Sequence, residues 1–97
     1  MTMNAQRNNG NFRPRTYEIK VPWLTPEDVI IKVEKWLAAE GDYIEIDQDL
    51  VELKVNGEQF ILPSPLDGVL QEILAFPGDF VETGQELAIV ILSPPIE

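Results

Sequence analysis

Few residue types in this chain could perform covalent chemistry. It has no cysteine and no histidine, which removes the thiol nucleophile, the disulfide and the commonest acid–base and metal-binding side chain. Carboxylates gather between positions 40 and 49, at Glu40, Asp42, Glu45, Asp47 and Asp49. They lack the spacing of a calcium-binding loop, so we interpret them as a solvated acidic edge. No nucleophile, base and orienting group stand at a recognisable spacing, and we expect no metal site and no enzyme activity.

The charge of the chain is acidic and unevenly distributed. There are 17 acidic and 7 basic residues, giving a formal net charge of -10, and the first 15 residues hold three of the basic ones: Arg7, Arg13 and Arg15. An acidic body repels phosphate backbones, so we expect protein partners and no nucleic acid. No apolar run reaches the roughly 18 residues of a membrane span, and the first residues lack the apolar stretch of a secretory signal. We therefore predict a cytoplasmic protein without a membrane partner.

Composition divides the chain into one domain and two short tails. Residues 1–15 are rich in asparagine and poor in large apolar side chains, which predicts a disordered N-terminal tail. Residues 16–93 contain the alternating apolar pattern of strands, and residues 94–97 form a C-terminal tail. A chain of 97 residues supports a single hydrophobic core. We expect a monomer, or a weak homodimer formed through a sheet edge.

The sequence repeats itself at a spacing of 37 residues. Identical residues occur in register in both halves: Leu37-Ala38 and Leu74-Ala75, Gly41-Asp42 and Gly78-Asp79, and Glu45, Gln48 and Leu50 with Glu82, Gln85 and Leu87. Each Gly-Asp pair separates two β-prone segments, as a turn between strands does. The repeat therefore predicts two copies of one unit and about eight short strands. Trp36, which corresponds to Ile73 in the second copy, is expected in the core.

One segment has a competing interpretation. Residues 25–28, Thr-Pro-Glu-Asp, resemble the start of a helix over 26–40. The β-branched side chains at 29–31 and 33 favour a strand instead, and we expect a strand over 29–33.

The two halves meet at Asn56-Gly57, which lies between alternating apolar residues. This is the strongest short-range signal of a β-hairpin with a two-residue type I′ turn. The turn predicts the pairs Val55–Glu58, Leu53–Phe60 and Val51–Leu62, with their apolar side chains on one face. Lys54 then lies opposite Gln59 on the other face.

The order of these landmarks resembles the biotinyl/lipoyl attachment domain family. The matching segments are Trp36-Leu37, Glu40-Gly41-Asp42, Gln48, Leu50-Val51-Glu52, Pro63-Ser64-Pro65-Leu66-Asp67-Gly68, Pro77-Gly78-Asp79 and Gly84-Gln85-Glu86-Leu87. They cover about residues 17–92. The resemblance implies an all-β, flattened barrel of two four-stranded antiparallel sheets, related by a pseudo-twofold axis.

The resemblance also implies where a cofactor would be attached, and that position holds no lysine. Family members carry Asp-Lys-Ala (lipoyl) or Met-Lys-Met (biotinyl) in the central hairpin, and counting back 11 residues from Gly68, as their spacing requires, reaches Gly57. Asn56, Gly57 and Glu58 replace the tripeptide, and none offers the primary amine that attacks an activated acyl adenylate. We interpret the chain as a degenerate member and expect no covalent cofactor.

Three functions follow from these observations. The first is a non-enzymatic protein-interaction module that binds a multienzyme complex or a lipoyl or biotin enzyme. Its partner-binding candidates are Trp23 and the tip residues Asn56, Gly57 and Glu58. The second is a lipoate or biotin carrier of an acyl-transfer or carboxylase complex modified at Lys54, three residues from the family position. The third is an efflux-adaptor-like domain, although such adaptors place a long helical hairpin where this chain has only Asn56-Gly57.

Overall fold

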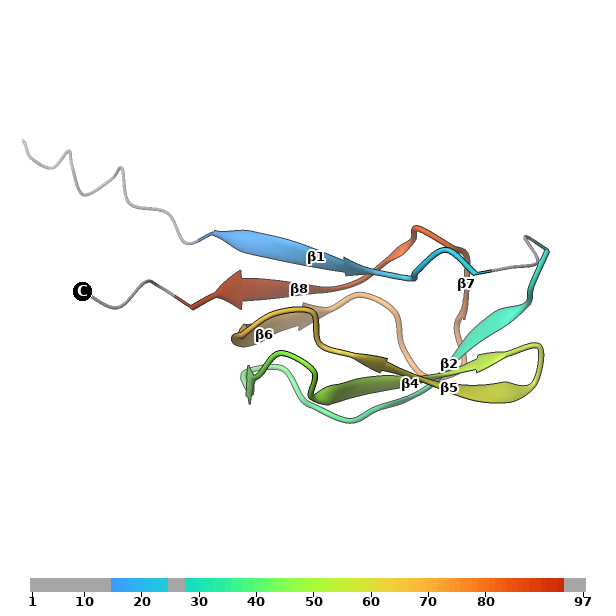
Figure 1. The fold of residues 1–97 in the computed structure, drawn as a ribbon, viewed down its shortest axis with the longest axis horizontal. Helices are drawn as coiled ribbons and strands as arrows, with labels where there is room; N and C mark the ends of the chain where they lie inside the picture. The colour runs from blue at the N-terminus through green and yellow to red at the C-terminus, as the bar shows by residue number, and fades with distance from the viewer. Residues whose placement is uncertain (1–14, 25–27, 94–97) are drawn as a thin grey trace, which may run out of the picture.

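The computed structural model describes residues 15–24 and 28–93, and these residues form eight strands and no helix (Figure 1). The strands are β1 (Thr16–Lys20), β2 (Ile31–Trp36), β3 (Tyr43–Ile44), β4 (Asp49–Val55), β5 (Glu58–Pro63), β6 (Gly68–Ile73), β7 (Phe80–Val81) and β8 (Glu86–Leu92). Except for Arg15, the tails predicted at 1–15 and 94–97 lie outside the described residues.

The strands form two sheets of four that face each other. One sheet has the order β1-β8-β6-β3 and the other β5-β4-β2-β7. All neighbouring strands are antiparallel. Each sheet takes strands from both halves of the chain, so neither half forms a layer by itself. The predicted all-β architecture of two four-stranded antiparallel sheets is confirmed.

Equivalent hydrogen bonds in the two halves follow the sequence repeat. The carboxylate of Asp42 accepts a hydrogen bond from the backbone N–H of Ala39 at 2.9 Å, and that of Asp79 accepts one from Phe76 at 2.8 Å. The side-chain oxygens of Gln48 and Gln85 accept from the N–H three residues earlier, each at 3.0 Å. The repeated Asp and Gln residues therefore close turns between strands.

The core lies between the sheets and consists of aliphatic side chains from both. Fourteen apolar residues are buried there: Ile19, Val21, Ile31, Val33, Ile44, Leu50, Val51, Leu53, Leu70, Ala75, Val81, Leu87, Ala88 and Val90. β4 and β8 have the same burial pattern along their seven residues. In each strand two adjacent residues are buried where the pairing register shifts, and buried and outward residues then alternate, as a two-layer sandwich requires.

Two sequence predictions need correction in the first half. The strand expected over 29–33 begins at Ile31 and continues to Trp36, because the main-chain groups of Ile30 bond to the hairpin tip instead of to a neighbouring strand. The helix considered for 26–40 does not form in its described part.

Trp36 is half-buried, whereas the sequence predicted a core position. It packs against the core and donates its indole N–H to the carbonyl of Ala75 at 2.8 Å.

The segment 63–68 carries the chain from one sheet to the other. Ser64 is 1% exposed, and its hydroxyl donates to the carbonyl of Leu66 at 2.7 Å, which satisfies the buried oxygen. The carboxylate of Asp67 accepts a hydrogen bond from the N–H of Ile46 at 2.7 Å. This crossing therefore joins the hairpin to the second half at a fixed geometry.

Candidate interaction site at the hairpin tip

The β4–β5 hairpin turns at Asn56 and Gly57, as the sequence predicts. Their φ angles are 50° and 84°, and a type I′ turn requires positive φ at both central residues. The predicted pairs Val55–Glu58, Leu53–Phe60, Val51–Leu62 and Lys54–Gln59 all occur. The register that places apolar side chains on the inner face of the hairpin is confirmed.

The tip is joined to the chain segment that precedes β2. The side-chain oxygen of Asn56 accepts a hydrogen bond from the backbone N–H of Ile30 at 2.9 Å. The backbone N–H of Asn56 donates to the carbonyl oxygen of Ile30 at 2.8 Å. Asn56 therefore has a structural role: it adopts the left-handed conformation of the turn and also fixes the turn to Ile30.

The turn carries no lysine, and its backbone conformation at Gly57 is one that glycine favours. A lysine at the position of Gly57 would have to adopt a φ near 84°, and the left-handed conformation costs an L-residue about 1 to 2 kcal/mol. Crowding is not the obstacle, because no atom lies within 4 Å of a Cβ built on Gly57. Asn56 and Glu58 offer no amine either. The three tip residues therefore cannot hold a lipoyl or biotinyl group by an amide bond.

Lys54, the alternative attachment residue, lies in β4, which is an interior strand of its sheet. Its side chain is half-buried on the outer face. Its cross-strand neighbours are Lys32 on β2 and Gln59 on β5. An attached group would thus leave from an outward-facing strand position beside the turn and not from the turn itself.

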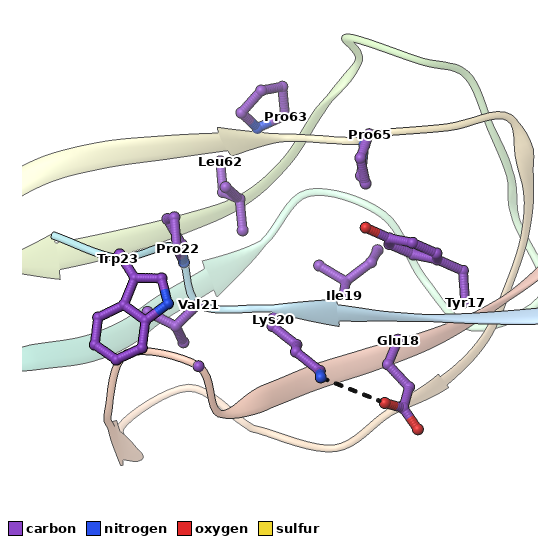
Figure 2. Close-up of a pocket in the computed structure, with 11 residues that line it drawn as sticks. Tyr17, Glu18, Ile19, Lys20, Val21, Pro22, Trp23, Leu62, Pro63 and Pro65 are labelled. Carbon is purple, nitrogen blue, oxygen red and sulfur yellow. Dashed lines mark ion pairs between the residues drawn. The ribbon is translucent and has the colours of Figure 1, made fainter.

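Trp23 lies at one end of a groove between β1 and β5, the edge strands of the two sheets (Figure 2). Its side chain is 79% exposed. The groove has a volume of about 330 Å³, and its lining is rich in proline and aromatic residues: Tyr17, Pro22, Trp23, Pro63 and Pro65, with Leu62 between the strands. The sequence indicated Trp23 as a partner-binding candidate but did not indicate the groove, because no local pattern places β1 beside β5. Residues 25–27 of the Trp23 loop lie outside the described residues.

The acidic residues between positions 40 and 49 are exposed, and two of them have defined structural contacts. The carboxylate of Glu40 accepts a hydrogen bond from the N–H of Ile73 at 2.9 Å, and Asp42 closes its own turn. In the described ranges, no group of three or more acidic, cysteine or histidine side chains is arranged to hold a metal ion. Within those same ranges no helix has the length and apolarity needed to cross a membrane.

The paired sheets and the central hairpin define a sandwich domain of the kind found in cofactor carriers. The chain belongs to the biotin/lipoyl family, since the family model described as "Biotin-requiring enzyme" matches residues 18–90.

Curated relatives are acyltransferase components of dehydrogenase complexes. The chain is 40% identical over 75 residues to the dihydrolipoyllysine-residue succinyltransferase component of the 2-oxoglutarate dehydrogenase complex from Bartonella vinsonii subsp. berkhoffii, covering 77% of this chain and 18% of the relative. It is 31% identical over 74 residues to the dihydrolipoyllysine-residue acetyltransferase component of the pyruvate dehydrogenase complex from Corynebacterium glutamicum, covering 76% and 11%. The chain thus spans less than a fifth of the length of these relatives.

Solved structures show the same fold. The lipoyl domain of the Azotobacter vinelandii 2-oxoglutarate dehydrogenase complex matches with a TM-score of 0.67 and 23% identity, over 79% of this chain and 98% of that domain. The Kluyveromyces lactis urea carboxylase matches with a TM-score of 0.68 and 18% identity, over 84% of this chain and 7% of the enzyme.

Proposed function

We propose that this chain is a non-enzymatic interaction module of the biotin/lipoyl family that carries no covalent cofactor. The observation that supports this most strongly is the tip turn of Asn56 and Gly57, which has no amine and is fixed to Ile30 by two hydrogen bonds. Without an amine at the tip no swinging arm can be attached there, so the domain does not transfer acyl or carboxyl groups between active sites. The domain still offers a folded surface that another protein can recognise.

The proposed partner is a protein of a lipoate- or biotin-dependent system, such as a subunit of a 2-oxoacid dehydrogenase complex. The relatives named above are components of such complexes. The proposed contact surface is the groove that ends at Trp23, together with the tip residues Asn56, Gly57 and Glu58. An indole that is 79% exposed beside a proline-lined groove is the kind of aromatic anchor that dominates protein interfaces.

Restoring the family tripeptide provides the sharpest test of the missing cofactor. The chain and the triple variant Asn56→Asp/Gly57→Lys/Glu58→Ala are each co-produced with a lipoate ligase and weighed by intact-mass spectrometry. We expect the triple variant to gain one lipoyl group and the unaltered chain to gain none. A lipoyl group on the unaltered chain that is lost in Lys54→Ala would overturn the proposal and support the carrier alternative. The same mass comparison, made with a variant that carries Met-Lys-Met at positions 56–58 and with a biotin ligase, tests for attachment of biotin.

The interaction itself is tested by pull-down from a cell extract with the tagged full chain. We expect the chain to recover an enzyme of a lipoate- or biotin-dependent system, and Trp23→Ala to recover less of it. Phe76→Ala is the matched control, because Phe76 is also exposed, at 53%, but does not line the groove. Recovery of no such enzyme, or an equal loss in both variants, would contradict the assignment of the surface.

A further inference from the structure

Four side chains form a continuous row across the outer face of the sheet β5-β4-β2-β7. Strand pairing places Gln59 opposite Lys54, Lys54 opposite Lys32, and Lys32 opposite Phe80. The residues that flank this row along the strands, among them Ile31, Val33 and Leu53, are buried in the core. Since side chains alternate between the two faces of a strand, the row faces outward.

The middle of this row is part of a groove, which we call the lysine groove. It is lined by Ile30, Lys32, Glu34, Lys54, Gly57 and Phe80 and has a volume of about 290 Å³. Its apolar walls are unusually open to solvent for such large side chains, with Ile30 63% and Phe80 69% exposed. The groove thus combines two cations and one carboxylate with two exposed apolar side chains.

The pairing of Lys32 with Lys54 is unfavourable in the isolated domain. Like charges directly opposite each other in a sheet are destabilising. The chain has only four lysines among 97 residues, yet two of them face each other here. In the part of the chain that the structure describes, the only ion pair joins Lys20 to Glu18, at 3.8 Å. The carboxylate of Glu34, although it lines the groove, therefore pairs with neither lysine.

We propose that the lysine groove binds an acidic segment of a partner protein. A carboxylate of the segment lies between Lys32 and Lys54, and an adjacent apolar side chain packs on Phe80 and Ile30. Charge complementarity favours this occupant, because a carboxylate between the two ammonium groups replaces a repulsion by two attractions. The apolar walls favour a peptide over a free inorganic anion, which would leave Phe80 and Ile30 in water.

The acidic surface of the rest of the domain adds selectivity. With a net charge of -10, the domain as a whole repels an acidic segment, and the facing pair of Lys32 and Lys54 is a local exception to this charge. The net charge therefore favours binding of an acidic segment at the lysine groove over binding to the rest of the surface.

This inference rests on the proposed function as an interaction module, but it concerns a different surface from the Trp23 groove. The failures of the two proposals remain distinguishable. Lipoylation of Lys54 in the mass experiment would contradict the first proposal, and it would also remove one of the two cations of the lysine groove. The peptide experiment below therefore uses chain whose intact mass is unmodified, and a loss of peptide binding by that chain would contradict only the second proposal.

The test uses the full chain and a capped pentapeptide of alternating leucine and aspartate, followed by two-dimensional ¹H–¹⁵N NMR. We expect the amides of residues 30–34, 53–57 and 80 to shift on titration. Each of Lys32→Gln and Lys54→Gln should weaken binding about threefold or more, the range of partly exposed ion pairs, and Phe80→Ser should weaken it as well. The analogous peptide with asparagine in place of aspartate should not bind measurably.

Lys35→Gln is the matched control, since it removes the same charge from the same strand but lies outside the groove. The NMR spectra of all variants also report whether each remains folded. Equal weakening by Lys35→Gln, equal binding of the asparagine peptide, or shifts confined to other strands would overturn the proposal. Shifts in these amides that depend on protein concentration without peptide would do so too, because they would make a second copy of the chain the occupant.

Discussion

Asn56 and Ile30, 26 residues apart in the sequence, are joined by two hydrogen bonds that fix the hairpin tip to the start of β2. The side-chain oxygen and the backbone N–H of Asn56 thereby bond both polar main-chain groups of Ile30. Asparagine suits the position for a second reason, because it tolerates the positive φ of 50° that the turn requires. In this domain the tip is therefore specialised for holding the hairpin in place.

Replacing Asn56 by alanine should lower the free energy of unfolding by about 1 to 2 kcal/mol. The substitution removes the acceptor for the Ile30 N–H and places an alanine in the left-handed region. Asn56→Asp, which keeps an oxygen at the same place and tolerates the same φ, should lose much less. Urea unfolding followed by tryptophan fluorescence measures both variants. An alanine variant as stable as the unaltered chain would show that the link to Ile30 contributes nothing.

Gly68→Ala should be the most destabilising glycine substitution in the domain, by about 2 kcal/mol or more. A Cβ at Gly68 would overlap the carbonyl oxygen of Ile91 and lie 2.7 Å from Cγ1 of Val90. Gly84→Ala is the comparison, because its surroundings are open and only its φ of 83° opposes a side chain, at a cost of about 1 kcal/mol. Thermal unfolding of the two variants shows which substitution lowers the stability of the domain more. A Gly84→Ala variant less stable than Gly68→Ala would refute the packing argument.

Asp47 occupies a strained position that its repeat partner fills with glycine. Its φ is 73°, and Gly84, which is equivalent in the second half, has a φ of 83°. The N–H groups of both residues donate equivalent hydrogen bonds, to the carbonyls of Ser64 and Val21. We expect Asp47→Gly to retain the stability of the domain and Asp47→Ala to lose about 1 kcal/mol. Equal losses in urea unfolding for the two variants would argue against backbone strain at this position.

The facing lysines predict a variant that is more stable than the natural chain. Lys54→Gln should raise the free energy of unfolding by about 0.2 to 0.5 kcal/mol at low salt, because it removes the repulsion with Lys32. The gain should shrink as salt screens the charges. Lys35→Gln should instead lower the free energy of unfolding slightly, since Lys35 lies opposite the acidic Glu52 in the strand register. A gain of the same size in Lys35→Gln would indicate a general effect of charge instead.

Local patterns in the sequence predicted the strands and the hairpin register, whereas the arrangement of the strands in two four-stranded sheets was what the family resemblance implied. The identities repeated at a spacing of 37 residues mark equivalent turns, and the Asn56-Gly57 signal fixes the pairs of β4 with β5 from the turn as far as Val51–Leu62, beyond which the register shifts. Both are short-range features, with turn chemistry and alternation acting over a few residues. The type and approximate place of each strand therefore follow from the sequence alone.

The long-range contacts could not be predicted in this way. Nothing around Asn56 in the sequence indicates that its side chain bonds Ile30, and nothing around Lys54 indicates that β2 brings Lys32 opposite to it. The Trp23 groove likewise depends on two edge strands, β1 and β5, that belong to different sheets (Figure 1). These features follow from how the strands are ordered in space, which a single sequence does not specify.

The mass of the protein isolated from the cells that naturally produce it tests the central claim most directly. Intact-mass spectrometry of that material, followed by mapping of its peptides, requires no choice of ligase or substrate. We predict that the peptide containing Lys54, Asn56, Gly57 and Glu58 has the mass of its unmodified sequence. A lipoyl or biotinyl group on Lys54 in a substantial fraction of the molecules would contradict the account and make the chain a carrier.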